Sequence, residues 1–191
     1  MYLAKYTAAI VSSSKPTPPR LELRSLWTPP PAPMFKINVD GAVLSALGAM
    51  GIGIIIRDEE GQVEAALSKR IEAPLGAIEA EAKAFEVGLL VAKDIGIQEV
   101  VLEGDSIIIY NALYDVSNPP SSVEPIIKGM HALCKYFRRV EFSHGRRQGN
   151  SPAHLLAKHA KSIADFSTWI EENRCFIEQA LIQDVIAFSH T

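Results

Sequence analysis

The amino-acid sequence predicts an α/β fold: a five-stranded mixed sheet, with three antiparallel and then two parallel strands, flanked by helices. Three strand-like segments between residues 35 and 71 are separated by short connections, which is typical of an antiparallel meander. After residue 77 the hydrophobic period changes to that of helices, which alternate with two further strands. Because strands connected through helices return in the same direction, these two should run parallel to the first.

The composition is that of one globular domain. The chain has 191 residues, 48% apolar and 21% charged. It lacks a run of about 18 apolar residues, so we expect no membrane span. Cys134 and Cys175 are too few for a disulfide framework and too isolated for a zinc site. They fit a reducing compartment. The localisation is otherwise open, with the nucleus or cytoplasm favoured over an organelle, and we expect a monomer. The net charge of −3 means that binding nucleic acid would require a local basic patch or bound cations.

Three regions are expected: a flexible leader with a proline-rich linker over residues 1–33, a domain over 34–163, and a helical extension over 164–191. The first residues contain serine and lysine but no acid, which also fits a targeting peptide or the remnant of a larger polyprotein. The run TPPPAP indicates an extended, solvated linker. The extension either caps the domain or contacts a partner protein, and capping is the favoured interpretation; its apolar residues are Trp169, Ile170, Phe176 and Ile177.

The first strand is predicted over Phe35–Asp40, FKINVD, with the apolar residues on one face and the polar residues 36, 38 and 40 on the other. A second strand is expected over Gly48–Arg57, where the glycines suit a tight turn or a close backbone contact. A third follows over Gln62–Ile71, after the turn DEEG. Asp40, followed by glycine, is thereby placed at the end of the first strand, away from the apolar core.

The second half of the chain begins with a helix over Ala77–Ile95, stopped by Gly96. A buried strand over Glu99–Gly104 follows, and the pair Asp105-Ser106 marks the N-cap of the next helix. The remaining elements are helices over Val123–Phe137, Ser151–Ile163 and Trp169–Phe188, and a fifth strand over Arg139–Ser143.

Three carboxylates should converge in this topology. If the first and fourth strands are parallel neighbours, Asp40 and Asp105 lie at related heights about 5 Å apart. Glu79 and Glu81 lie on different sides of their helix, and Glu81 is favoured to face the sheet because it flanks the alanine stripe. Carboxylates this close require either a raised pKa or a bound divalent cation. Taken singly, each residue is better explained by an ordinary role: Asp40 as a turn residue, Asp105 as a helix cap and Glu81 as a solvated helix residue. Their convergence nevertheless favours a metal site.

Five motifs occur in a recognisable order: FKINVDGA, GIGIIIRDEEG, EAEAKAFEVGLLVAKDIGI, VVLEGDS and HGRRQGNSPAHLLAKHA. Together they make residues 34–163 resemble the ribonuclease H-like domains of plant genomes and retroelement polyproteins. The tail WIEENRCFIEQALIQD also looks like the C-terminal extension of plant members. The resemblance implies endonucleolytic cleavage of the RNA strand of RNA–DNA hybrids with two Mg²⁺ ions.

The resemblance also implies the site. Asp40 matches the aspartate that bridges both metals, Glu81 and Asp105 match two further ligands, and His144 matches the loop histidine linked to product release. The fourth acidic ligand is replaced, because Asn150–Ala157 reads NSPAHLLA with His154 in its place. Imidazole suits softer transition metals than Mg²⁺, so His154 either ligates Mn²⁺ or positions water, or else it caps the helix beside a vestigial site.

On the substrate side, Ser45–Gly48 replaces the hybrid-contacting loop of bacterial members. Gly41, Arg146, Arg147 and Asn150 are the predicted substrate-binding residues. A local basic cluster either binds phosphates or forms a solvated surface; it consists of Arg146, Arg147, Lys158, His159 and Lys161. RNA would be recognised through its 2′-hydroxyls, as the family implies.

Two further functions stay open. One is a domesticated, catalytically weakened module that holds nucleic acid or a protein, which the replacement at His154 favours. The other is a fragment of a retroelement polyprotein. A serine nucleophile at Ser106 is disfavoured because no G-x-S-x-G elbow surrounds it.

Overall fold

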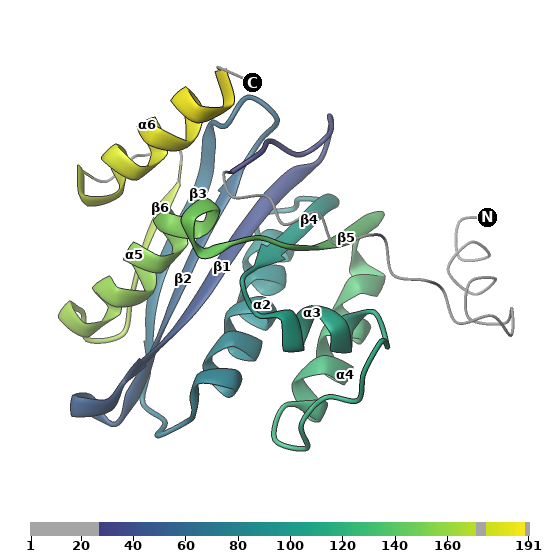
Figure 1. Cartoon of the computed structure of the whole chain (residues 1–191), viewed down its shortest axis with the longest axis vertical. Coiled ribbons are helices and arrows are strands. Elements are labelled where there is room, and N and C mark those ends of the chain that lie inside the picture. Colours follow the sequence, from purple (N-terminus) through teal and green to yellow (C-terminus); the bar gives the residue numbers. More distant parts are fainter. Residues whose placement is uncertain (1–26, 171–174, 190–191) are drawn as a thin grey trace, which may run out of the picture.

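The structure, a computed structural model, describes residues 27–170 and 175–189. A six-stranded sheet has helices on both faces (Figure 1). Its strands are β1 (Phe35–Leu44), β2 (Ala49–Arg57), β3 (Val63–Ile71), β4 (Glu99–Gly104), β5 (Arg139–His144) and β6 (Phe166–Ile170). Its α-helices are α2 (Ala77–Asp94), α3 (Ile107–Leu113), α4 (Glu124–Leu133), α5 (Ser151–His159) and α6 (Cys175–Ser189).

The strand order β5-β4-β1-β2-β3-β6 confirms the predicted mixed sheet. β1, β2 and β3 are antiparallel neighbours, whereas β4 pairs in parallel with both β1 and β5. The predicted number of strands is corrected from five to six. Residues Phe166–Ile170 add a strand antiparallel to β3, so the prediction of a helix beginning at Trp169 is wrong there. The open edge of β3 supplies hydrogen-bonding partners that no local sequence pattern reveals.

Small residues let α5 pack closely on β2. A Cβ atom at Gly53 would lie 2.0 Å from the carbonyl oxygen of Ala153, and one at Gly51 would lie 2.1 Å from that of Ala157. Both clashes are with backbone, so the glycines are needed for this contact. The predicted close backbone approach is thus confirmed for these two glycines, and it places the first turns of α5 against the centre of the sheet.

The two faces of the sheet are covered differently. The larger core fills the side of α2, α3 and α4 and includes Ile37, Val39 and Phe85. A smaller apolar cluster lies under α5 and α6 and includes Trp169 and Ile177. Through these two residues the C-terminal extension covers part of this face of the sheet, as the capping interpretation expects. The side chains of Ile170 and Phe176 lie outside the described residues.

Most of the predicted leader, residues 1–26, lies outside the described residues, as do residues 171–174 of the extension. The division at residues 33/34 stays a prediction. Within the described part, packing reaches back to Trp27, which is buried. None of the helices described is both long and apolar enough to cross a membrane.

Candidate active site

The candidate site lies where β1 continues past the end of β4. The parallel pairing of these strands ends at Asn38 and Glu103, whereas β1 runs on to Leu44 along β2. The prediction that the first strand ends at Asp40 is therefore corrected: Asp40 lies inside a longer strand. Asp105 follows β4 directly, so its side chain reaches the same opening. Openings at the carboxyl ends of parallel strands are common ligand sites.

Glu81 reaches the opening from α2 because this helix lies against Gly41. A Cβ atom at Gly41 would be 2.3 Å from the carbonyl carbon of Ala80 and 2.6 Å from the backbone nitrogen of Glu81. The Gly41 N–H also hydrogen-bonds to the Glu81 carboxylate. The group that approaches Gly41 closely is therefore the backbone of α2. Gly41 thus positions Glu81, and because it is only half-buried its predicted contact with substrate stays a prediction.

The carboxylates of Asp40, Glu81 and Asp105 offer ligand atoms that all lie within 4.8 Å of one another. Burial, together with repulsion from Asp40 and Asp105, raises the pKa of Glu81 to about 9. Burial also raises the pKa of Asp40, although the hydrogen bond and charge of His154 work against this shift. The Oε2 atom of Glu81 is buried without a hydrogen-bond partner among the described atoms. Such a carboxylate group suits a divalent cation, since a cation would satisfy the orphaned oxygen and offset the repulsion.

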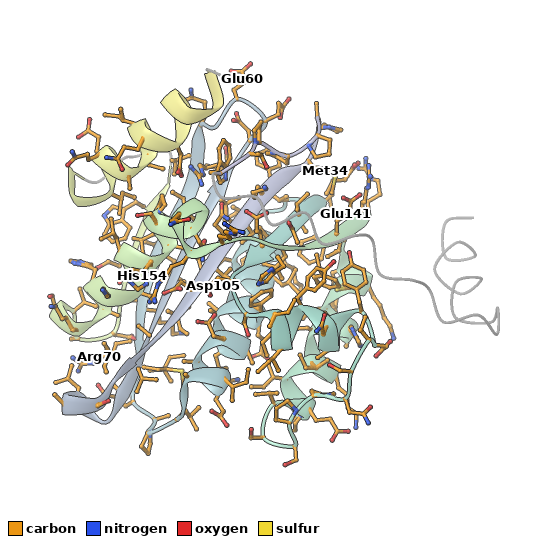
Figure 2. All side chains as sticks on the ribbon, viewed as in Figure 1. Met34, Glu60, Arg70, Asp105, Glu141 and His154 are labelled. Atoms are coloured by element: carbon orange, nitrogen blue, oxygen red, sulfur yellow. The ribbon has the colours of Figure 1, made fainter. Side chains whose placement is uncertain are left out.

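His154 contacts this cluster directly. Its Nδ1 atom lies 3.0 Å from Oδ2 of Asp40, and Arg147 Nη2 lies 3.4 Å and 3.5 Å from the two ring nitrogens. In Figure 2, His154 and Asp105 lie close together at the centre of the sheet. His154 is the fourth residue of α5, whose N-cap is Asn150 without a side-chain capping bond. The imidazole is therefore placed for contact with Asp40 and not as a helix cap.

His144 has a different setting from that predicted. It is the last residue of β5, whereas the resemblance implied a position in the following loop. Its Nε2 lies 3.1 Å from the backbone oxygen of Asp105, so the imidazole supports the backbone next to the cluster and Nε2 carries the proton. The ring also packs beside Tyr110, with 6.0 Å between ring centroids.

The predicted substrate-binding residues separate into two groups. Arg146 and Arg147 are exposed beside the cluster. Asn150 is only 1% exposed, and its amide donates a 2.7 Å hydrogen bond to the carbonyl of Val39. This bond ties the start of α5 to β1 next to Asp40. The expected substrate contact of Asn150 is thus corrected to a positioning contact, because a side chain buried to this extent has no free surface for a ligand.

A buried polar network beside the site was missed by sequence reasoning. The carboxylate of Glu103 accepts hydrogen bonds from Lys36 at 3.1 Å, Asn38 at 3.0 Å and Ser143 at 2.7 Å. Burial acts to raise the pKa of Glu103, but the Lys36 charge and these hydrogen bonds lower it overall. The available signal was the row of polar residues at 36, 38 and 40 on one face of a central strand. Such a row is unusual on a strand covered on both faces.

Ser106, in contrast, behaves as an ordinary helix cap. It is the N-cap residue of α3, and its hydroxyl accepts a hydrogen bond from the backbone N–H of Ile109. This confirms the predicted start of that helix and leaves the neighbouring Asp105 carboxylate to the cluster.

Comparisons with known proteins agree with this geometry. The model of a family described as reverse transcriptase-like matches residues 38–160, more than half of the chain. The comparison with curated proteins finds no match.

Several solved structures share the fold. RNase H1 from the halophilic archaeon Halobacterium salinarum NRC-1 is 23% identical with a TM-score of 0.64, and the alignment covers 69% of this chain and 99% of that one. LC11-RNase H1, isolated from compost by a metagenomic approach and solved with an RNA/DNA hybrid, is 22% identical with a TM-score of 0.61, covering 68% and 99%. The prototype foamy virus protease-reverse transcriptase is 18% identical with a TM-score of 0.55, covering 69% and 21%. The predicted ribonuclease H-like fold is thereby confirmed.

Proposed function

Because this chain belongs to the reverse transcriptase-like family and has a ribonuclease H-like fold, we propose that it cleaves within the RNA strand of RNA–DNA hybrids by two-metal-ion hydrolysis. The single observation that carries the proposal is the convergence of Asp40, Glu81 and Asp105 within 4.8 Å. The similarity to an RNase H1 solved with an RNA/DNA hybrid supports nucleic acid as the partner.

The three carboxylates would hold the cations. Mg²⁺ ions, or Mn²⁺ ions, bound there would supply positive charge for the scissile phosphate and its leaving oxygen and would activate water. The protein's own contribution is to hold the carboxylates close together at fixed positions. Gly41 fixes Glu81 through its backbone, His144 supports the backbone of Asp105, and Asn150 ties α5 to β1 beside Asp40.

His154 has two roles in this proposal. Its Nδ1 hydrogen bond to Asp40 orients the carboxylate, and its position on α5 makes it the fourth ligand or the group that positions water. Arg147, beside the His154 ring, carries a positive charge that favours the ionised forms of Asp40 and Glu81. It also offers a donor for a phosphate oxygen at the mouth of the site.

A second function, a nucleic-acid-binding module with weakened catalysis, is favoured by one specific observation. His154 forms a hydrogen bond with Asp40 and, unlike a carboxylate, adds no negative charge to the cluster. Three carboxylates bind a divalent cation less strongly than four, because each ionised ligand adds attraction for the cation. Metal binding alone cannot separate the two functions, whereas strand cleavage does.

The deciding experiment is cleavage of an end-labelled RNA–DNA hybrid by the wild type and by Asp40→Asn, in Mg²⁺ and separately in Mn²⁺. The matched control is Asp94→Asn, at the last residue of α2 and exposed. We expect internal cuts in the RNA strand by the wild type and the control, and at least a hundredfold loss in Asp40→Asn. A folded wild type that binds the hybrid but cuts it in neither metal would reject the nuclease and support the binding module.

A further inference from the structure

Helix α6 forms one wall of a cleft beside the candidate active site. The cleft has a volume of about 870 Å³. One wall, at the start of α5, carries Arg146, Arg147, Gln148 and His154, and the other carries Ala180 and Gln183 of α6. His154 belongs both to this cleft and to the contact with Asp40, so the cleft adjoins the carboxylate cluster through His154. In Figure 1, α6 lies beside α5.

The polar groups of the cleft are mainly donors. Arg146 and Arg147 are exposed, and in the described part of the chain no carboxylate lies within ion-pair distance of either. Gln148 and Gln183 are also exposed and add amide groups. The acidic residue that lines the cleft is Asp184, whose Oδ2 atom is paired with Arg57 Nη1 at 2.9 Å. The cleft therefore carries two guanidinium groups that form no direct ion pair among the described residues, although Arg147 also acts electrostatically on Asp40 and Glu81.

Helix α6, which forms one wall of the cleft, is anchored to strand β2 by an ion pair. The Arg57–Asp184 ion pair is buried, with side-chain exposures of 0% and 7%. Arg57 also donates to Asn38 at 3.1 Å, and its guanidinium lies 3.9 Å from the ring centroid of Trp27. Apolar packing of Ile177 and Leu181 adds to this attachment. The wall is thus held to strand β1 only two residues before Asp40, so the cleft and the cluster keep a defined relation.

We infer that this cleft binds the phosphodiester backbone of the nucleic acid at a position away from the scissile phosphate. Arg146 and Gln183 contact it from opposite walls. The inference rests on the proposed function for the identity of its ligand, and it adds α6 to the substrate-binding surface. Guanidinium and amide donors match phosphate oxygens, which accept hydrogen bonds whatever the base sequence.

The test measures binding of a fluorescein-labelled RNA–DNA hybrid by fluorescence anisotropy in EDTA, where the proposed reaction cannot proceed. Gln183→Lys should tighten binding about fivefold and Gln183→Glu should weaken it by a similar factor. Arg146→Gln should weaken binding and reduce the slope of log K against log salt by about 0.9. The matched controls are Gln98→Lys and Gln98→Glu, because Gln98 is exposed just before β4, at the strand end opposite the site.

The inference would be overturned if the wild type, Gln183→Lys and Gln183→Glu bound the hybrid with equal affinity. It would also be overturned if the changes in affinity were no larger than those of the Gln98 variants. A wild type without salt-dependent binding would overturn it as well. Failure of the proposed function is distinguishable: a wild type that binds in this pattern but never cleaves the hybrid rejects the nuclease and leaves the cleft assignment standing. Cleavage with no effect of the Gln183 variants rejects the cleft alone.

Discussion

The Nδ1 atom of His154 and the Oδ2 atom of Asp40 are 3.0 Å apart, so an imidazole nitrogen lies directly against the central carboxylate of the candidate site. A fourth carboxylate at this place would add negative charge for a cation. An imidazole adds a hydrogen bond and a nitrogen ligand. Since Mg²⁺ prefers oxygen ligands and imidazole suits transition metals, this one contact sets the expected metal preference of the protein.

His154→Asp should raise the rate of hybrid cleavage in Mg²⁺ by about tenfold or more, because it adds an oxygen ligand beside Asp40. The wild type should cleave faster in Mn²⁺ than in Mg²⁺, and this ratio should fall in the variant. Initial rates on a labelled hybrid in each metal measure both effects. Lys135→Gln, at an exposed position after α4, makes the same change of one charge away from the cluster and from the basic residues near it. Equal rates for His154→Asp and wild type in Mg²⁺ would contradict the assigned position of His154.

The stability of the metal-free protein should fall as pH rises. The pKa of Glu81 is about 9 in the folded state against an ordinary value of 4.5, so between these values the folded state retains a proton that the unfolded state has lost. The free energy of unfolding therefore decreases with pH across this interval. Glu81→Gln removes the ionisation and should stabilise the protein at pH values near 8 by roughly 1–3 kcal/mol.

Urea denaturation in EDTA at several pH values measures this dependence. Glu79→Gln, on the same helix but outside the cluster, should keep the downward slope. Added Mn²⁺ should stabilise the wild type more at higher pH, because binding to Glu81 displaces its proton. A wild-type stability that does not change between neutral and alkaline pH would rule out the raised pKa.

Gly53→Ala should destabilise the protein by roughly 1–3 kcal/mol, since the new methyl group would lie 2.0 Å from the carbonyl oxygen of Ala153. Relief requires moving α5, which also separates His154 from Asp40. Gly129→Ala is the control: in α4 the nearest atom to its new methyl group is Glu86 Oε1 at 3.4 Å. This control should be neutral or stabilising by up to about 1 kcal/mol. Equal effects of the two substitutions in chemical denaturation would show that α5 does not need the glycine.

Asp184→Ala should destabilise the fold by roughly 3–5 kcal/mol, because it leaves Arg57 buried without its ionic partner. Glu124→Ala breaks an exposed ion pair with Lys128 on α4 and should cost less than about 1 kcal/mol. Both are measured by urea denaturation at neutral pH. A cost for Asp184→Ala as small as that for Glu124→Ala would mean that α6 is not anchored by this pair.

The order of the elements could be predicted because its signals are local. The strand Glu99–Gly104 has the predicted bounds, and the helix predicted over Ala77–Ile95 ends one residue earlier, at Asp94. Hydrophobic period, turn residues and the Ser106 cap act within a few residues of the chain. The convergence of Asp40, Glu81 and Asp105 followed from that order, since parallel neighbours place their carboxyl ends at one edge.

Elements at the end of the chain were harder to predict for a physical reason. Phe166–Ile170 is a strand only because the edge of β3 is free to pair with it, and that edge is made by residues about a hundred positions earlier. The longer second half of β1 likewise depends on its pairing with β2 beyond the end of β4. Local periodicity cannot report partners that are distant in sequence.

The sequence by itself determined the mixed sheet, the succession of its first five strands along the chain and the three carboxylates that meet at its opening. Only the tertiary structure decided what surrounds them. It gave Asn150 and Gly41 positioning contacts within the protein, brought His154 onto Asp40, and buried Arg57 in an ion pair with Asp184. The physical reason is that a residue's type limits which bonds it can form, whereas long-range packing sets which groups lie within bonding distance.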